Sequence, residues 1–386
     1  MSADGARIAG LAETAAGKHE GRSTLDLVVE VAAGAISDAG LDWEAIDGLI
    51  ATQPLVGAFP RHAAALAEYL GLSAQMRFCA TVTSGGASAL EAVVDAVRVV
   101  EDGTCDTVLV VAADTPRTGR ARDATVEGYA RMRHPDFEQP HGLTNAAAYA
   151  LLARRYIDAA GADPEQLAAV AVMLRDHARG HPGAAYRDPL AVEDVLRSRL
   201  VSTPLRLLEC SPVCDGGAAL VVARRGHGPG GGQPSVSLAG HGHGYRYDHI
   251  VYAPELGETG CALSGRRALA AAGLSVDQVD VALLYDSYSV TLLIELEELG
   301  FCAPGAAAGL VASGRFGGVG RPALNTHGGL LSHGHCGGAA GMHHVTEAVQ
   351  QLRGTAANQV PDARVALVHG EGGIMSTHCT ALLVAE

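Results

Sequence analysis

The sequence predicts an α/β fold in which a sheet is covered by helices on both faces. Two observations support this prediction. Short strands that are apolar throughout alternate with Ala-rich helical stretches, as expected where both faces of a sheet are buried. The same short motifs then recur in the same order along the 386 residues, as expected of a duplicated α/β unit.

The first third of the chain shows the alternation most clearly. The expected strands are Arg7–Leu11, Gly48–Thr52, Arg77–Val82 and Thr107–Ala113. The expected helices are Ser23–Ala39, Arg61–Leu70 and Ser84–Glu101. Each strand is followed by a helix or a turn, which is the order of elements in α/β proteins.

The middle of the chain, from about 116 to 202, has a different character. It is charged and irregular over Arg117–Pro140 and then helical over Asn145–Ala160 and Pro164–Gly180. We interpret it as a loop domain inserted over the face at which α/β folds bind ligands. The strands Leu205–Cys210 and Ala218–Ala223 are expected next, and the Gly-rich stretch from Arg224 to Pro234 has the composition of a linker.

After this linker the pattern of the first part starts again. Ala39-Gly40-Leu41 precedes one expected strand, and Ala272-Gly273-Leu274 precedes another. Gly85-Gly86-Ala87 opens a helix in the first part, and Gly337-Gly338-Ala339 opens one in the second. We therefore predict two similar halves, residues 1–232, which include the loop domain, and residues 233–386.

Charge and cysteine usage narrow the class of protein. With 28 Lys and Arg against 42 Asp and Glu, the formal charge is −14, which argues against a nucleic-acid partner. No stretch is apolar for long enough to span a membrane, and the start of the chain lacks the features of a secretory leader. The eight cysteines are scattered like reduced thiols, so we expect a cytoplasmic protein.

The Gly-dense loop Asn325–Met342, NTHGGLLSHGHCGGAAGM, carries the strongest chemical signal. It delivers His335, preceded by Gly334, to the start of a helix. The partial positive charge there lowers the pKa of an imidazole and stabilises oxyanions, so a neutral His335 could donate a hydrogen bond to a thioester or enolate oxygen. The alternative is a Gly-rich turn with a helix-capping histidine.

The segment Leu283–Val290, LLYDSYSV, places polar side chains at the end of a buried strand. These are Tyr285, Asp286 and Tyr288. The carboxyl ends of such strands bind ligands, so Tyr285 is a candidate proton donor or base, although its ordinary pKa near 10 requires help at neutral pH. The alternative is a structural hydroxyl packed against the following helix.

Two further strand-to-Gly junctions complete the candidate site. In Val82–Leu90, VTSGGASAL, the hydroxyl of Thr83 or Ser84 lies at a strand-to-helix turn and is either functional or only an N-cap. In His369–Gly373, HGEGG, the backbone at Gly372 and Gly373 could supply an oxyanion-hole N–H.

No metal site is expected from residue spacing. Cys210 and Cys214 flank a turn without a second pair at zinc-finger spacing. The remaining histidines lack a recurring ligand motif, and we interpret most of them as loop or surface residues; they are His241, His243, His249, His327, His333, His343 and His344.

These four stretches, in the order in which they occur along the chain, resemble motifs of the thiolase superfamily, in particular of its sterol-carrier-protein thiolase and lipid-transfer-protein branch. GGLLSHGHCGGAAG is similar to the family's GGxxxxGHPxGAxG loop, YDSY to its HDCF or NEAF motif, and HGEGG to its C-terminal Gly-rich motif. The stretch from Ala253 to Gly257 is similar to a substrate loop of the family.

The resemblance implies a fold and partners. The fold is a five-layered αβαβα sandwich of two βαβαβαββ halves with an inserted loop domain, in a homodimer. The substrate is an acyl-CoA, and no cofactor is implied beyond the coenzyme A of the substrate. Some members of this branch work with a small companion protein that has an OB-fold and a zinc ribbon.

The departures from the family pattern favour a particular reaction. The acyl-accepting Cys of thiolases falls at Thr83, and their second catalytic Cys falls at His369. A Thr hydroxyl is a poor acyl acceptor without a matched base. Some members of the branch that lack the Cys are aldolases, so the resemblance favours retro-aldol cleavage of a β-hydroxyacyl-CoA to a ketone and a shorter acyl-CoA, with a sterol side chain as one candidate acyl group.

In that hypothesis Tyr285 is the acid/base and His335 holds the enolate oxygen, while Asp286 and His369 orient groups or relay protons. The backbone at Thr83 and Gly372 shapes the pocket. Two alternatives stay open at this point. One is Claisen-type acyl transfer or thiolysis with Thr83, Ser84 or Cys336 as the acyl carrier, and the other is a non-catalytic scaffold that binds acyl-CoA or lipid.

Overall fold

The strands of the computed structural model form one large mixed sheet. The model describes residues 5–226, 234–254, 259–317 and 320–386. Within these residues the strand order is β10-β9-β11-β12-β8-β1-β7-β4-β2-β3. The strands are β1 (Ala6–Glu13), β2 (Gly48–Thr52), β3 (Phe78–Val82), β4 (Thr107–Asp114), β7 (Gly216–Arg224), β8 (Val236–Tyr245), β9 (Val281–Leu283), β10 (Ala323–Leu324), β11 (Val365–Gly372) and β12 (Thr377–Ala385).

The sheet consists of two sets of five strands with the same internal order. One set runs β3-β2-β4-β7-β1 and the other runs β10-β9-β11-β12-β8, and the two meet where Ile8 of β1 pairs with Val236 of β8. The predicted boundary between residues 232 and 233 lies outside the described residues, as does most of the expected linker. The division at that position therefore stays a prediction.

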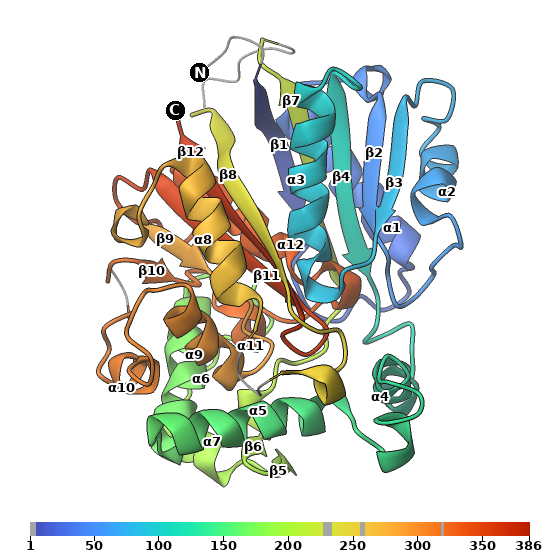
Figure 1. The fold of residues 1–386 in the computed structure, drawn as a ribbon. Coiled ribbons are helices and arrows are strands. Elements are labelled where there is room, and N and C mark those ends of the chain that lie inside the picture. The colour runs from blue at the N-terminus through green and yellow to red at the C-terminus, as the bar shows by residue number, and fades with distance from the viewer. Residues whose placement is uncertain (1–4, 227–233, 255–258, 318–319) are drawn as a thin grey trace.

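Helices form three layers around the two sets of strands (Figure 1). Helices α3 (Ser88–Glu101) and α12 (Met342–Arg353) lie between the sets and contact strands of both. Helices α1 (Thr24–Asp38) and α2 (His62–Tyr69) cover the outer face of the first set, and α8 (Cys261–Ala272) and α9 (Ser289–Glu298) cover that of the second. The predicted five-layered αβαβα sandwich is confirmed.

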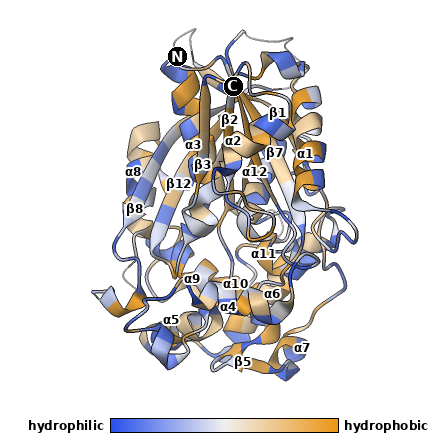
Figure 2. Cartoon of the chain, turned by 90° about the vertical axis from the view of Figure 1, so that its right-hand side faces the viewer, coloured by the Kyte–Doolittle hydropathy of each residue, from blue (hydrophilic) through white to orange (hydrophobic). Residues whose placement is uncertain are grey.

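Apolar side chains fill the spaces between these layers. One buried cluster joins α3 and α12 to both sets of strands, and separate clusters lie beneath α1 and α2 and beneath α8 and α9. Figure 2 shows hydrophobic residues gathered around the strands, while the helices of the lower part carry many hydrophilic residues. The strands are buried on both faces, which explains why they are apolar throughout.

The inserted segment lies across one end of the sheet (Figure 1). Its elements are α4 (Arg122–Ala130), α5 (Asn145–Ala160), α6 (Pro164–Arg179), α7 (Val192–Arg197), β5 (Leu200–Ser202) and β6 (Leu205–Arg206). The second half adds two short helices, α10 (Ala307–Ala312) and α11 (Gly329–Ser332). Single 3₁₀ turns lie at Trp43–Ala45, Gly85–Ala87, Gln139–His141, Leu207–Glu209, Ile250–Tyr252, Val276–Gln278 and Gly337–Ala339.

Local signals in the sequence explain where several helices begin and end. Ser23 caps α1 in a reciprocal capping box with Asp26. Asp163 forms the same arrangement with Gln166 ahead of α6, and Pro164 occupies the first turn, where its missing N–H costs nothing. Helix α12 ends at Gly354, whose φ of 76° favours glycine.

Two expectations, one for the insertion and one for the stretch directly after it, are wrong. The stretch Leu205–Cys210 continues as a strand only through Arg206, because its next three residues form a 3₁₀ turn. The stretch Arg117–Pro140, expected to be irregular, contains helix α4. This helix has few apolar residues, so the sequence shows no helical period of hydrophobicity there.

None of the helices in the described residues is long and apolar enough to cross a membrane.

One buried carboxylate ties three segments together at the end of the first set of strands. Asp114, the last residue of β4, accepts hydrogen bonds from the N–H groups of Leu55 (2.8 Å), Val56 (3.1 Å) and Gly338 (2.9 Å), and from its neighbour Thr115 (2.9 Å). Burial raises the pKa of Asp114 to about 6, although these donors act in the opposite direction. The bond to Gly338 links the first half to the loop that carries His335.

We therefore predict that Asp114→Ala lowers the free energy of unfolding by about 2–4 kcal/mol, because it leaves buried N–H groups without an acceptor. Urea unfolding followed by circular dichroism measures this difference. The control is Asp136→Ala, which removes an exposed carboxylate and should change stability by less than about 0.5 kcal/mol. Equal stability of the two variants would show that Asp114 does not hold these segments.

Candidate active site

Glycines bring the predicted segments of the two halves together at the carboxyl end of the sheet. A Cβ on Gly86 would overlap the ring of Tyr285 and the carbonyl oxygen of Glu371. A Cβ on Gly372 would overlap the carbonyl oxygen of Ser84, and one on Gly341 would lie 2.7 Å from the carbonyl oxygen of Gly86. The strand-to-helix turn of the first half therefore packs directly against Tyr285 and the end of β11.

Tyr285 and His335 form the centre of this region. The hydroxyl of Tyr285 lies 3.0 Å from Nε2 of His335, and the two rings meet edge-on with centroids 6.0 Å apart. Tyr285 follows β9, and His335 precedes the 3₁₀ turn η7 (Gly337–Ala339) that leads to α12. The predicted acid/base residue and the predicted oxyanion-binding residue are thus hydrogen-bonded to each other.

Two backbone hydrogen bonds join the His335 loop to the segment that precedes β7. His335 donates its N–H to the carbonyl of Pro212 at 3.0 Å, and its carbonyl accepts from Cys214 at 2.9 Å. Gly334 has a φ of 127°, and a Cβ there would lie 2.8 Å from the sulfur of Cys214. Only glycine can therefore place His335 in this position.

Burial keeps both members of the pair uncharged near neutral pH. It lowers the pKa of His335 to about 4. Burial, together with the negative charge of Glu371, raises the pKa of Tyr285 well above its ordinary value. A free phenolate base is therefore unavailable at neutral pH, and proton transfer through Tyr285 requires His335 to take or return the proton at the same time.

The two hydroxyls of the strand-to-helix turn have different surroundings. Thr83 is exposed at the end of β3. The hydroxyl of Ser84 donates to the carboxylate of Glu91, which also accepts from Tyr245 at 3.1 Å. The Ser84 side chain is therefore hydrogen-bonded to α3, while the Ser84 backbone lies beside Gly372.

The structure does not bring the carboxylate of Asp286 to the pair. It accepts hydrogen bonds from Nδ2 of Asn325 (2.8 Å) and from the N–H groups of Leu330 (2.8 Å) and Leu331 (2.9 Å) at the start of α11. Because these donors use the carboxylate lone pairs, the position of Asp286 supports a role in holding the loop and gives no support to the predicted proton relay.

His369 also lies away from the pair, because successive residues of a strand point to opposite faces. Gly370 and Gly372 face the turn at Ser84–Ala87, whereas His369 faces outward from that turn, towards Thr380 and His378. The position expected from the family's second cysteine therefore does not present the imidazole of His369 to Tyr285.

Glu371, between two glycines of the HGEGG motif, was not among the predicted residues. Its carboxyl is buried and accepts from the hydroxyls of Tyr149 (2.6 Å) and Ser287 (3.1 Å) and from the N–H of Met375 (3.1 Å). Burial raises its pKa to about 7. The acidic residue within a Gly-rich motif was the available signal, whereas Tyr149 comes from the insertion and no motif marks it.

Tyr288 and Gly373 belong to this surrounding network. The ring of Tyr288 stacks on that of Tyr149, with centroids 4.3 Å apart. The carbonyl of Gly373 lies 3.2 Å from the hydroxyl of Tyr149. Arg133, also from the insertion, is buried with Nε and Nη1 lacking hydrogen-bond partners, and its charge lowers the pKa of Glu371.

The interpretation of the late histidines as loop or surface residues is wrong. His327, His333, His343 and His344 are each 1% exposed. Their rings contact one another in a row that ends at His344. The ring of His344 stacks on that of Tyr285, with centroids 6.1 Å apart. The fold buries them because α12, which carries two of them, lies between the two sets of strands.

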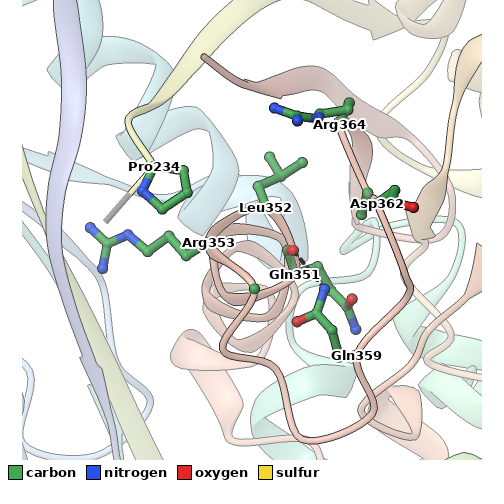
Figure 3. A pocket seen from close by; sticks show the side chains of 9 residues that line it. Pro234, Gln351, Leu352, Arg353, Gln359, Asp362 and Arg364 are labelled. Carbon is green, nitrogen blue, oxygen red and sulfur yellow. Dashed lines mark hydrogen bonds between the residues drawn. The ribbon is translucent and has the colours of Figure 1, made fainter. Parts of the chain in front are cut away.

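A shallow pocket at the opposite end of α12 is separate from this region (Figure 3). Gln351, Leu352 and Arg353 from the last turn of α12 line it together with the loop before β11. His335 precedes the first turn of the same helix, so this pocket is no part of the candidate active site. The predicted substrate loop from Ala253 to Gly257 lies outside the described residues from position 255 onward.

We predict that Gly86→Ala displaces Tyr285 from His335, because the added Cβ would overlap the Tyr285 ring. The free energy of unfolding should fall by about 1–3 kcal/mol, as for other overpacked sites. In a crystal structure of the variant, the Tyr285 hydroxyl should lie well beyond the 3.0 Å that separates it from Nε2 of His335 in the wild type. Gly17→Ala is the matched control, since a Cβ there meets nothing within 4 Å. An unchanged distance between Tyr285 and His335 would contradict the prediction.

Comparison with known proteins places the chain in a family. A model of the thiolase N-terminal domain matches residues 6–226, and a thiolase C-terminal domain-like model matches residues 242–385. A 17-hydroxy-3-oxo-4-pregnene-20-carboxyl-CoA lyase of Mycobacterium tuberculosis is 35% identical, over 96% of this chain and 97% of its own. A steroid side-chain-cleaving aldolase of Thermomonospora curvata is 34% identical, over 96% and 95%.

Solved structures agree with these sequence matches. One described as an Ltp2-ChsH2(DUF35) aldolase superposes with a TM-score of 0.86 at 34% identity, covering 99% of this chain and 98% of that one. Human mitochondrial 3-ketoacyl-CoA thiolase, at 14% identity and a TM-score of 0.75, shares the fold over 99% of both chains. The chain therefore belongs to the thiolase superfamily, in its sterol-carrier-protein thiolase and lipid-transfer branch.

Proposed function

We propose that this enzyme cleaves a β-hydroxyacyl-CoA by a retro-aldol reaction, releasing a ketone and a shorter acyl-CoA. The observation that carries the proposal is the hydrogen bond between Tyr285 and His335 at the site of a thiolase fold. Acid/base groups therefore stand where thiolases carry out thiol chemistry, and retro-aldol cleavage needs proton transfer and no covalent intermediate.

The names of the relatives support the substrate class. The Mycobacterium tuberculosis relative is a lyase for a 17-hydroxy steroid whose C20 carries the carboxyl-CoA group. In such a compound the 17-hydroxyl is β to the thioester, which is the arrangement that a retro-aldol reaction requires. We propose the same class here, a β-hydroxyacyl-CoA with a branched or cyclic β-carbon such as a steroid side chain.

The first step breaks the bond between the α- and β-carbons. The hydroxyl oxygen of Tyr285 accepts the proton of the substrate's β-hydroxyl while the phenol proton moves to Nε2 of neutral His335. The β-carbon becomes a ketone, and the electron pair of the broken bond passes to the thioester as an enolate. The proton held by His335 then returns through Tyr285 to the α-carbon, so the pair ends in its starting state.

The enolate oxygen needs donors other than His335, because Nε2 of that residue is occupied by Tyr285. Of the two predicted helix N-termini, the one at η7 already gives the Gly338 N–H to Asp114. The first N–H groups of the turn at Gly85–Ala87 have no partner within the helix and are the better candidates. This assignment replaces the expectation that His335 holds the enolate oxygen.

The positions of the cysteines support a reaction without an acyl-enzyme. Cys336, considered as a displaced nucleophile, is fully buried, and burial raises its pKa well above the ordinary value. Cys79 is exposed on β3 but lies four residues before Thr83, within the strand. Neither thiol resembles the activated thiolate that acyl transfer requires.

The proposal extends to partners and compartment. The similar solved structure is described with a second component, ChsH2(DUF35), and we propose a small OB-fold, zinc-ribbon companion for this chain as well. Among the strands of the described residues, β3 pairs only with β2, so we propose that its other edge pairs with a second copy in a homodimer. All eight cysteines are free, which supports a reducing, cytoplasmic location.

We predict that Tyr285→Phe lowers kcat for ketone release by roughly 10²–10⁴-fold, because it removes the group that exchanges protons with the substrate. The assay incubates the enzyme, with its companion if one is required, with a 17-hydroxy steroid 20-carboxyl-CoA and measures ketone and acyl-CoA by mass spectrometry. Tyr69→Phe, which alters a tyrosine that is 60% exposed, is the control and should retain full activity.

Two results would overturn this proposal. The first is thiolysis of a ketoacyl-CoA without ketone release from any β-hydroxyacyl-CoA. The second is an acyl-enzyme mass shift that maps to Thr83, Ser84 or Cys336, which would instead establish acyl transfer. Full activity of the Tyr285→Phe variant would show that another group moves the proton.

The pH dependence of kcat/KM tests the assignment of His335 as the proton acceptor. His335 accepts a proton only when neutral, and burial lowers its pKa to about 4. The acidic limb of the profile should therefore fall near pH 4 and not near the ordinary histidine value of about 6.5. Circular dichroism at each pH identifies loss of fold, and an acidic limb near pH 6.5 in the folded enzyme would contradict the assignment.

A further inference from the structure

A second group of buried polar side chains lies on the outer face of the second set of strands. Cys261 begins α8, His369 lies in β11 and His378 lies in β12. One potential ligand atom from each lies within 4.8 Å of the other two, and all three residues are buried. The catalytic role proposed above uses none of them.

The hydrogen bonds of the two imidazoles direct one nitrogen of each ring towards the other. Nε2 of His378 lies 2.9 Å from the carbonyl of Met375, which can only accept, so Nδ1 of His378 carries a lone pair. Nδ1 of His369 lies 2.8 Å from the hydroxyl of Thr380. The remaining nitrogens, Nε2 of His369 and Nδ1 of His378, are 3.1 Å apart.

Glu295 of α9 lies next to this group, although it is outside the set of atoms that lie within 4.8 Å of one another. Its side chain is fully buried, and neither carboxyl oxygen has a hydrogen-bond partner. Oε1 lies 4.0 Å from Nε2 of His369. Burial raises the pKa of Glu295 well above its ordinary value, although the backbone of Tyr285 acts in the opposite direction. The buried carboxyl group therefore needs either a proton or a nearby cation.

We propose that Cys261, His369 and His378 bind a zinc ion and that the side chain of Glu295, 4.0 Å from His369, turns towards it as the fourth ligand. Thiolate, imidazole and carboxylate are the ligand types of four-coordinate zinc sites, and two ligand atoms about 2.0–2.1 Å from a tetrahedral metal lie roughly 3.4 Å apart, close to the separation of the two imidazole nitrogens. The charges also balance, since one thiolate and one carboxylate neutralise Zn²⁺ in a buried site.

The surrounding contacts are those expected around a metal ligand. Each imidazole has its second nitrogen fixed by an oxygen of the protein, Thr380 for His369 and the Met375 carbonyl for His378. The Thr380 hydroxyl is in turn 2.8 Å from the hydroxyl of Ser264 in α8. With four protein ligands the site has no open position, so the zinc would stabilise the packing of α8 and α9 on β11 and β12.

A metal-free arrangement is the competing explanation. A chain of hydrogen bonds from Thr380 through His369 and His378 to the Met375 carbonyl satisfies both imidazoles without a metal. It leaves the Cys261 thiol without a counterpart and requires Glu295 to be buried as a protonated acid, which is why we favour zinc. The two arrangements differ in measurable metal content.

The test uses the full-length chain purified free of any companion protein, so that zinc in a partner is not counted. Zinc per chain is measured by plasma mass spectrometry, and the metal-depleted protein is titrated with Co²⁺, whose absorption reports thiolate ligation. The variants are Cys261→Ser and Glu295→Gln, and the second covers the case in which the first fails to fold. Cys379→Ser is the matched control, because it removes an equally buried thiol that packs in the core between the two sets of strands.

We expect one zinc per chain in the wild type and in Cys379→Ser, and at least a tenfold loss of affinity in Cys261→Ser and Glu295→Gln. The thiolate-to-cobalt band should disappear only in Cys261→Ser, and a chelator should lower the Tm of the wild type. Absence of zinc and of a cobalt band in the wild type, with a chelator-insensitive Tm, would overturn the proposal, as would full retention of metal in both ligand variants. Metal content and cobalt absorption report on this site, whereas ketone release reports on the proposed lyase activity, so failure of one proposal is distinguishable from failure of the other. Ketone release is not compared in Glu295→Gln, because the charge of Glu295 acts on Tyr285.

Discussion

The close approach of backbone to backbone at the meeting of the two halves is the constraint on which the site depends. Gly86 and Gly372 have no side chains, so the turn that opens α3 can rest directly against the ring of Tyr285 and the end of β11. Gly334 and Gly341 give the His335 loop the same freedom on the other side. A methyl group at Gly86 would separate the pair that carries out the proposed chemistry.

Burial then decides what the assembled groups can do. The same desolvation keeps His335 neutral and Tyr285 protonated, so the pair can move a proton only in a concerted way. Asp286 and Glu371 hold the surrounding loops through hydrogen bonds from backbone N–H groups and hydroxyls. A thiolase fold can thus perform carbon–carbon cleavage by proton transfer when no activated thiol stands at its site.

The fold was largely predictable from the sequence, because its strands are short apolar runs and its helices carry local capping signals. Strand β2 and helix α5 lie at the predicted residues, whereas α1 is one residue shorter than predicted at each end and β4 is one residue longer at its end. The larger errors lie in the inserted segment and directly after it. Helix α4 has too few apolar residues to show a period, and the stretch after Arg206 turns although its composition suits a strand.

The sequence by itself determined the α/β class, the Gly-rich turns and the presence of Tyr285 and His335 next to them, because these features are local and follow from residue type. Only the tertiary structure decided which side chains meet. Strand alternation turned His369 away from Tyr285 and towards Cys261 and His378, and the packing of α12 between the two sets of strands buried histidines whose sequence context suggested the surface. The insertion supplied Tyr149 to Glu371 across 222 positions of sequence, an interaction that no local pattern contains.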